Sequence, residues 1–137
     1  MSDLKKVYGF AILGTGMISK FHARALRELP EAKLIAVCSR DMLRAKAFAA
    51  EFDCQAFDRL DAMLAKVEVD VLIIATPSGS HMEPAVAAAQ AGKHVLCEKP
   101  LDVTLERVDA MIAAHRESGT QLGCTFQIRY TPALQPI

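Results

Sequence analysis

Short, strongly apolar runs alternate with longer amphipathic runs along the whole chain, and this alternation constrains the fold more than any other feature. Residues 69–75 (VDVLIIA) are apolar almost throughout, which is typical of a central parallel strand buried on both faces. Such runs predict strands at residues 7–13, 34–38, 54–57, 69–75, 94–97 and 121–125. Helices are expected between them, at residues 17–29, 42–52, 60–65, 81–91 and 104–118. Strands separated by crossover helices predict an α/β fold with a doubly wound parallel sheet.

The spacing of apolar residues within two of these helices predicts which side faces the sheet. In residues 17–29 and 42–52 the inward-facing side chains are expected to be Ile18, Phe21, Ala25, Leu29, Leu43, Ala47 and Ala50. Thr104 and Gly119 are residue types that begin and end helices, so they are expected to bound the helix at residues 104–118. Pro132 is expected to open one more helix.

Charge and composition exclude several classes of protein. The chain has 16 Lys and Arg against 16 Asp and Glu, so no net charge attracts nucleic acid or a membrane surface. No apolar run reaches the roughly 18 to 20 residues of a membrane span, and the N-terminus lacks the apolar stretch of a signal peptide. The four cysteines form no CxxC pair and indicate reduced, half-buried thiols in a cytoplasmic protein. The histidines lack zinc-site spacing, so no metal is expected.

A glycine turn lies between the first expected strand and the first expected helix. Gly14 permits a tight turn, Gly16 removes the side chain that would keep a diphosphate from the backbone, and the small Ser19 lets helix and strand pack closely. Ser19 departs from the usual Gly or Ala. The free N–H groups at the helix start suit phosphates, although a purely structural turn is the alternative. The predicted contacts of this Rossmann dinucleotide-binding turn are Gly14, Thr15, Gly16, Met17 and Ile18.

The end of the second strand indicates which dinucleotide is bound. Domains that prefer NAD usually place Asp or Glu there, to bind both ribose hydroxyls. This chain instead has Ser39, which can donate to a 2′-phosphate, and Arg40, which can pair with that phosphate or stack on adenine. Asp41 can still reach a ribose, and Arg40 is alternatively a solvated surface residue. We therefore expect NADP or NAD as cofactor, with NADP favoured.

Two further loops follow later strands at the carboxyl edge, where ligands bind in sheets of this kind. The first, ATPSGSH (residues 75–81), has two turn-formers and three hydroxyls that can lie against a ribose or a nicotinamide. The second is CEKP (residues 97–100). With the glycine turn, these elements resemble in order and spacing the glucose–fructose oxidoreductase / inositol dehydrogenase / MocA family. The resemblance covers essentially the whole chain, and EKP is its most specific element.

The resemblance implies an enzyme that transfers a hydride between NAD or NADP and a hydroxyl or ketone of a sugar, inositol or nucleotide sugar. Lys99 resembles the family's catalytic lysine, and an amine at hydrogen-bond distance can accept the proton of the reacting hydroxyl. Glu98 resembles the residue that binds the nicotinamide ribose, and Pro100 fixes the turn, in many members through a cis bond. The alternative from the residues alone is that Glu98 and Lys99 form a solvated surface pair.

Other residues carry weaker expectations. His81 stands where the family often has a histidine, and it either contacts the cofactor or packs at the start of its helix. Gln127 and Arg129 resemble a polar segment near the nicotinamide, with an interdomain salt bridge as the alternative for Arg129. His22 and His115 are expected on helix surfaces. The cofactor contacts expected outside the glycine turn are Ser39, Arg40, Thr76, Pro77, Ser78, His81, Glu98, Lys99, Pro100, Gln127 and Arg129.

The family's enzymes have a second α/β domain that binds the polyhydroxylated substrate and often builds the oligomer. We expect residues 1–125 to form the dinucleotide-binding domain and residues 126–137 to begin the junction to a missing second domain, with Ile137 a cut within a longer protein. The chain alone is then expected to bind nucleotide without turnover, and the parent protein to be a homo-oligomeric enzyme.

A different function class remains open at this stage. A regulator that senses dinucleotide on the same fold needs no catalytic lysine, so the intact EKP element favours the enzyme. A short-chain reductase is disfavoured because the chain has no Tyr-x-x-x-Lys pair. A methyltransferase would leave EKP unexplained.

Overall fold

A single parallel sheet of six strands organises the computed structural model, which describes residues 6–134. The strands are β1 (Tyr8–Leu13), β2 (Ala32–Cys38), β3 (Gln55–Phe57), β4 (Val71–Ile74), β5 (His94–Cys97) and β6 (Leu122–Cys124). The helices are α1 (Met17–Arg27), α2 (Met42–Phe52), α3 (Leu60–Leu64), α4 (Met82–Gln90) and α5 (Leu105–Ser118), followed by the 3-10 turns η1 (Gln127–Tyr130) and η2 (Pro132–Leu134). The predicted doubly wound α/β fold is confirmed.

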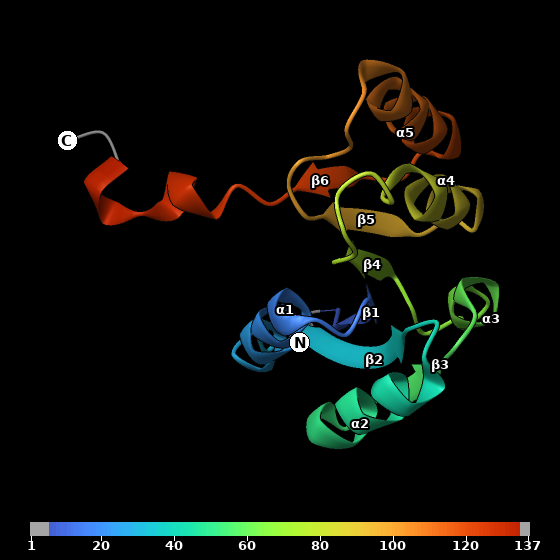
Figure 1. Cartoon of the computed structure of the whole chain (residues 1–137), viewed down its shortest axis with the longest axis vertical. Coiled ribbons are helices and arrows are strands. Elements are labelled where there is room, and N and C mark those ends of the chain that lie inside the picture. Colours follow the sequence, from blue (N-terminus) through green and yellow to red (C-terminus); the bar gives the residue numbers. More distant parts are fainter. Residues whose placement is uncertain (1–5, 135–137) are drawn as a thin grey trace, which may run out of the picture.

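The strand order β3-β2-β1-β4-β5-β6 reverses direction between β1 and β4 (Figure 1). From β1 the chain moves outward through β2 to β3, then returns to β4 on the other side of β1 and moves outward through β5 to β6. Loops at the carboxyl ends of the two strands that flank such a reversal lead away from each other and leave a crevice. The loops after β1 and β4 flank it here.

Each face of the sheet carries its own hydrophobic core. Leu72 and Ile74 of β4 belong to a cluster with α3, α4 and α5, whereas Ile73 belongs to a second cluster with α1 and α2. β1 divides in the same way between Ala11 and Ile12, because successive side chains of a strand point to opposite faces. All five side chains are at most 1% exposed, which explains the nearly continuous apolar run at β4.

The predicted inward face of α1 is wrong. Phe21 and Leu29 are 55% and 51% exposed, Ala25 is also exposed, and only Ile18 packs partly against the core. α1 begins directly after the glycine turn and lies close to the sheet, so small side chains fit best on its inner side. The buried positions are Ser19, Ala23 and Leu26.

The predicted inward face of α2 is also wrong. Leu43 is 80% exposed, and Ala47 and Ala50 are exposed as well. The helix instead buries Phe48 and Phe52, whose ring centroids lie 4.6 Å apart. Burying two aromatic rings removes more apolar surface from water than burying one leucine and two alanines, so this rotation of α2 is favoured.

The other local predictions are closer to the structure. The Thr104 side chain accepts a hydrogen bond from Arg107 N at the start of α5, and Gly119 ends that helix with φ 69°. Pro132 opens η2, a single 3-10 turn. All four cysteines are free thiols, and burial raises the pKa of Cys97 to about 12 and that of Cys38 to about 11. Both thiols are therefore neutral and weakly nucleophilic at neutral pH.

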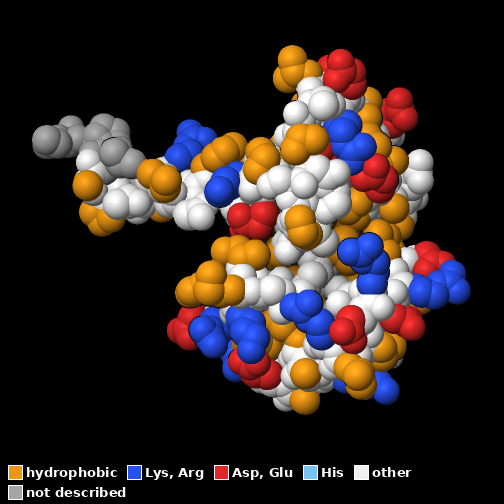
Figure 2. Space-filling view, in the orientation of Figure 1, with side chains coloured by type: hydrophobic (Ala, Val, Ile, Leu, Met, Phe, Trp, Pro, Cys, Tyr) orange, Lys and Arg blue, Asp and Glu red, His pale blue; other side chains and the backbone are white. Residues whose placement is uncertain are grey.

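The surface carries both signs of charge side by side. Figure 2 shows Lys and Arg side chains interspersed with Asp and Glu side chains over the visible face. Within residues 6–134, every helix is too short or too polar to cross a lipid bilayer. The same residues contain no group of three His, Cys, Asp or Glu side chains arranged to hold a metal ion.

Gly9 of β1 generates a stability prediction. A Cβ at this position would lie 1.8 Å from the backbone carbonyl oxygen of Glu68. We expect Gly9→Ala to lower the free energy of unfolding by about 3 kcal/mol, because the overlap displaces backbone beside a central strand. Urea denaturation measures the change.

Gly16→Ala is the matched control for this measurement. A Cβ there meets no atom within 4 Å, and Gly16 has an ordinary φ of −75°. Its stability is expected to stay within about 0.5 kcal/mol of the unchanged chain. Equal stability of the two variants would contradict the packing described for β1.

Candidate functional site

A cleft of about 940 Å³ opens at the carboxyl ends of β1, β2 and β4. The last residues of β1 and β2, Leu13 and Cys38, contribute to it, as does Ala75 directly after β4. The cleft therefore lies at the reversal of strand order, as expected for this class of sheet. Its lining consists of Leu13, Gly14, Thr15, Gly16, Cys38, Ser39, Arg40, Arg44, Leu60, Ala75, Thr76, Pro77, Ser80, Glu83, Pro84 and Ala87.

The glycine turn forms one wall of this cleft. Gly14 has φ 111°, and a Cβ there would lie 2.7 Å from the carbonyl oxygen of Ala75, so only glycine fits. Gly14 N donates to Cys38 O at 2.9 Å, and Ala75 N donates to Leu13 O at 2.9 Å. Gly16 instead borders open space. The first glycine is thus required by the fold, whereas the second leaves room beside the backbone.

The N-terminus of α1 differs from those of the other long helices. Asp41 caps α2, Thr104 caps α5, and the Asp102 carboxylate accepts from His81 N and Met82 N at the start of α4. The residue before α1, Gly16, offers no side-chain cap, and the first turn of α1 has no acidic residue. Its first N–H groups therefore keep their capacity to bind an anion.

The loop after β2 brings two arginines to the cleft. Arg40 and Arg44 both line it, and neither guanidinium forms a hydrogen bond or ion pair with residues 6–134. Ser39 lines it as well, although its hydroxyl accepts from Asp41 N at 3.3 Å. The Asp41 carboxylate is engaged as the cap of α2, accepting from Leu43 N and Arg44 N. The sequence prediction missed Arg44, which lies in the first turn of α2, directly after the predicted contacts Ser39 and Arg40.

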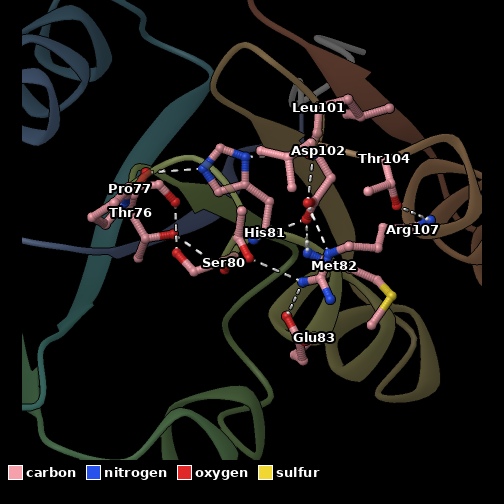
Figure 3. Close-up of polar contacts among 12 residues, drawn as sticks. Thr76, Pro77, Ser80, His81, Met82, Glu83, Leu101, Asp102, Thr104 and Arg107 are labelled. Carbon is pink, nitrogen blue, oxygen red and sulfur yellow. Dashed lines mark hydrogen bonds and ion pairs between the residues drawn. The ribbon is translucent and has the colours of Figure 1, made fainter.

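The ATPSGSH loop after β4 is held by its own hydroxyls and by His81 (Figure 3). Ser80 Oγ donates to Pro77 O at 2.6 Å, and Thr76 Oγ1 donates to Ser80 O at 3.4 Å. Thr76, Pro77 and Ser80 line the cleft, whereas Ser78 is exposed outside it.

His81 itself is fully buried. Its Nε2 lies 2.9 Å from Thr76 O, and its Nδ1 lies 3.0 Å from Pro100 O and 3.2 Å from Leu101 O. His81 does not line the cleft, and its expected cofactor contact stays a prediction. Its ring instead joins the loop after β4 to the loop after β5, in keeping with the packing alternative.

Asp102 is the centre of the polar network drawn in Figure 3. Its fully buried carboxylate accepts from Arg107 Nε at 2.8 Å, from Val103 N at 2.7 Å and from Met82 N at 2.8 Å. Burial alone would raise the pKa of Asp102, but these hydrogen bonds outweigh it and lower that pKa to about 2. Arg107 also donates to Gly79 O and Glu83 Oε2, so the network reaches both the ATPSGSH loop and α4.

The EKP element lies at the same edge, directly after β5. Glu98 N donates to Ile74 O at 2.9 Å, and Glu98 is only 9% exposed. The Lys99–Pro100 peptide bond is cis, and both residues are exposed. The Lys99 amine forms no bond with the described residues. None of these three residues belongs to the lining of the cleft, so their predicted roles stay predictions.

The remaining predicted contacts lie outside the cleft. Met17 is 77% exposed and Ile18 is half-buried on α1. Gln127 and Arg129 are exposed on η1, in a segment that runs away from the sheet past β6 (Figure 1). The structure therefore brings together seven of the predicted contacts in the cleft: Gly14, Thr15, Gly16, Ser39, Arg40, Thr76 and Pro77.

Two histidines expected on helix surfaces are partly or fully buried, so those predictions are wrong. His115 is 3% exposed, its Nδ1 lies 2.7 Å from Thr120 Oγ1, and burial lowers its pKa. His22 Nε2 donates to Glu98 Oε1 at 2.6 Å. Helical spacing showed only that these histidines lie on helices, because their partners come from other segments of the chain.

Residues 8–126 match the family described as "Oxidoreductase family, NAD-binding Rossmann fold". The chain belongs to this family. The resemblance inferred from the glycine turn, ATPSGSH and CEKP is thereby confirmed.

Similar proteins include several dehydrogenases of sugars and inositols. The chain is 34% identical over 123 residues to the inositol 2-dehydrogenase of Rhizobium meliloti, covering 90% of the chain and 37% of that protein. It is 36% identical over 124 residues to the scyllo-inositol 2-dehydrogenase (NADP(+)) of Bacillus subtilis, covering 90% of the chain and 38% of that protein.

The chain is also similar to solved structures of dehydrogenases. The WlbA dehydrogenase from Bordetella pertussis, in complex with NADH and UDP-GlcNAcA, superposes with a TM-score of 0.88 at 34% identity, covering 95% of this chain and 37% of that one. In each of these comparisons the chain spans less than two fifths of the relative's own length.

The Asp102 network generates a pH prediction. The folded-state pKa of about 2 lies below the ordinary value near 3.9, so Asp102 stabilises the fold fully above about pH 4 and loses this effect as the pH falls toward 2. We expect Asp102→Asn to lower the free energy of unfolding by about 3 kcal/mol at pH 7, because Arg107 loses its buried carboxylate. Urea denaturation at pH 7 and at pH 3 measures both effects.

The exposed Asp109 of α5 provides the control. Asp109→Asn is expected to keep the pH dependence of the unchanged chain, whereas Asp102→Asn flattens it between pH 4 and pH 2. Parallel pH profiles for Asp102→Asn and the unchanged chain would show that this carboxylate does not carry the acid sensitivity.

Proposed function

We propose that this chain is the NAD(P)-binding domain of an oxidoreductase that transfers a hydride between the nicotinamide and a hydroxyl or ketone of a sugar, inositol or nucleotide sugar. The observation that carries the proposal is the uncapped N-terminus of α1, which begins at Gly16 beside the cleft. Backbone N–H groups at a helix start suit a diphosphate. Relatives named as inositol dehydrogenases, and a WlbA dehydrogenase bound to NADH and UDP-GlcNAcA, support the reaction class.

Residues in the cleft and at the neighbouring carboxyl end of β5 would divide the cofactor between them. The open space at Gly16 and the first amides of α1 would hold the diphosphate. Ser39, Arg40 and Arg44 would hold the adenosine end at the edge of β2. The ATPSGSH loop, Glu98 and Lys99 follow β4 and β5 on the other side of the reversal, so they would face the nicotinamide half. The cofactor, when bound, supplies or accepts the hydride.

NADP is the preferred cofactor in this proposal. Arg40 and Arg44 are two guanidiniums without a protein partner in residues 6–134, and both line the part of the cleft after β2 to which the proposal assigns the adenosine end, so they can bind a 2′-phosphate. Asp41, the nearest carboxylate in sequence, is committed to capping α2. The relatives include one named for NADP(+) and one bound to NADH, so the family accommodates both cofactors.

The double variant Arg40→Ala/Arg44→Ala tests this preference. We expect it to weaken NADP⁺ binding about 100-fold, because each arginine contributes a charge-assisted hydrogen bond, while NAD⁺ binding changes by less than about threefold. Titration calorimetry measures both dissociation constants. Arg24→Ala, on the exposed side of α1, is the control and is expected to change neither. An equal loss for both cofactors would assign the arginines a role other than phosphate recognition.

Lys99 is the proposed catalytic residue. When a hydride leaves an alcohol carbon, the hydroxyl must lose its proton, and an amine within hydrogen-bond distance can accept it. The Lys99 side chain is exposed and has no bond to residues 6–134, so it is available to a substrate. Its position after β5 puts it at the carboxyl edge of the sheet.

Lys99→Met in the enzyme that carries this domain tests the assignment. We expect kcat to fall by about 10² to 10⁴-fold while the dissociation constant of NADP⁺ changes by less than about threefold, because transfer of the proton depends on the amine far more than cofactor binding does. Lys46→Met, an exposed lysine of α2, is the control for loss of charge. An unchanged kcat would overturn the catalytic role of Lys99, and no turnover in the unsubstituted protein would favour a dinucleotide-sensing regulator.

The proposal also covers the second domain, the oligomer and the cellular location of the protein. Residues 1–125 form the dinucleotide-binding domain, and residues 126–137 lead to a second domain. That second domain binds the polyhydroxylated substrate and joins copies into a homo-oligomer. Residues 1–5 and 135–137 lie outside the part of the chain that the structure describes. Phe126, Ile128 and Tyr130 are 50%, 65% and 81% exposed, which suits a segment covered by another domain. The chain alone then binds nucleotide without turnover. Four free cysteines support a cytoplasmic location.

A further inference from the structure

His22 and Glu98 meet across the carboxyl edge of the sheet, although they are 76 residues apart in sequence. His22 lies in the middle of α1, the helix that begins at the glycine turn, and Glu98 directly follows β5. β4 separates β1 from β5 in the sheet, so the pair joins the helix after β1 to the loop after a strand that is not adjacent to β1. His22 Nε2 donates to Glu98 Oε1 at 2.6 Å, and the two side chains are only 15% and 11% exposed.

The bond occupies one carboxylate oxygen of Glu98 and leaves the other available. The Glu98 N–H donates to Ile74 O at the end of β4. This bond fixes the position of the Glu98 backbone, and therefore of its Cβ, relative to β4. Oε2 forms no hydrogen bond with residues 6–134 and is not among their enclosed unpartnered atoms. An ionised carboxylate has room for several donors, so Oε2 can still accept from a ligand.

We propose that His22 is a positioning residue that holds Glu98 in the orientation in which Oε2 accepts a hydroxyl of the nicotinamide ribose. The inference rests on the proposed function, because it needs a dinucleotide in the cleft. It goes beyond that function because it gives His22 a role in binding the nicotinamide half of the cofactor, although His22 belongs to the helix whose N-terminus would bind the diphosphate. One helix then aligns both halves: its N-terminus faces the diphosphate, and His22 in its second turn fixes the ribose acceptor.

A positioning role and a purely structural role of His22 predict different losses of affinity. A positioning role affects only the part of the ligand that Glu98 would contact. Adenosine 2′,5′-bisphosphate contains the adenosine end of NADP⁺ but lacks the nicotinamide ribose. Without His22, the Glu98 side chain gains rotamers and must be ordered again when the ribose binds, which weakens NADP⁺ only. A general loosening of α1 would weaken both ligands.

Titration calorimetry of the 137-residue chain with both ligands tests the proposal. We expect His22→Ala to raise the dissociation constant of NADP⁺ about tenfold and to change that of the bisphosphate by less than about twofold. His22→Gln keeps an N–H donor and is expected to recover affinity to within about threefold of the unchanged chain. If His22→Ala does not fold, His22→Leu fills the same space without a donor and takes its place.

His94→Ala is the matched control. His94 begins β5 at the opposite, amino edge of the sheet, where its Nδ1 accepts from Gln121 N. This variant is expected to change neither dissociation constant.

Each other outcome overturns a specific claim. Parallel losses for NADP⁺ and the bisphosphate, or no loss for either, would overturn the role of His22 while leaving the proposed cofactor site intact. Failure of the unchanged chain to bind either ligand would overturn the proposed function, and this inference with it.

Discussion

The close contact between Gly14 and Ala75 is the constraint on which the carboxyl edge of the sheet depends. A Cβ at Gly14 would lie 2.7 Å from Ala75 O, and Gly14 N donates to Cys38 O, so the turn is fixed against both neighbouring strands. α1 must then begin directly after Gly16, with its free N–H groups beside the cleft. The N–H groups proposed to bind the diphosphate are thus in place before any ligand arrives, and preorganisation of this kind reduces the entropy lost on binding.

The strands could be predicted from sequence because burial on both faces leaves a nearly unbroken apolar run. The inward faces of the helices could not. In α2 apolar residues occur on all sides, and only the assembled sheet favours burying Phe48 and Phe52 over Leu43. In α1 the close approach at the glycine turn selects Ser19 and Ala23 for the inner face, so the larger Phe21 is left exposed. Spacing within a helix carries no information about either effect.

The site divides in the same way between local and long-range features. The glycine turn was predictable because the backbone geometry is set by residues adjacent in sequence. The contacts of His22 with Glu98 and of His81 with Pro100 were not, because those partners lie 76 and 19 residues away in a loop whose approach depends on the whole sheet. Asp102 shows the point most clearly: it caps α4 from a different loop, 20 residues after Met82. No pattern of spacing indicates such a cap.

A crystal structure of the chain with NADP⁺ tests the central claim most directly, since that claim is geometric. The cofactor is expected to place its diphosphate within hydrogen-bond distance of the first amides of α1, beside Gly16, with its nicotinamide ring next to the Lys99 amine. A diphosphate bound away from the turn at residues 14–16, or a Lys99 amine on the far side of the sheet from the ring, would contradict the assignment of this cleft as a dinucleotide site.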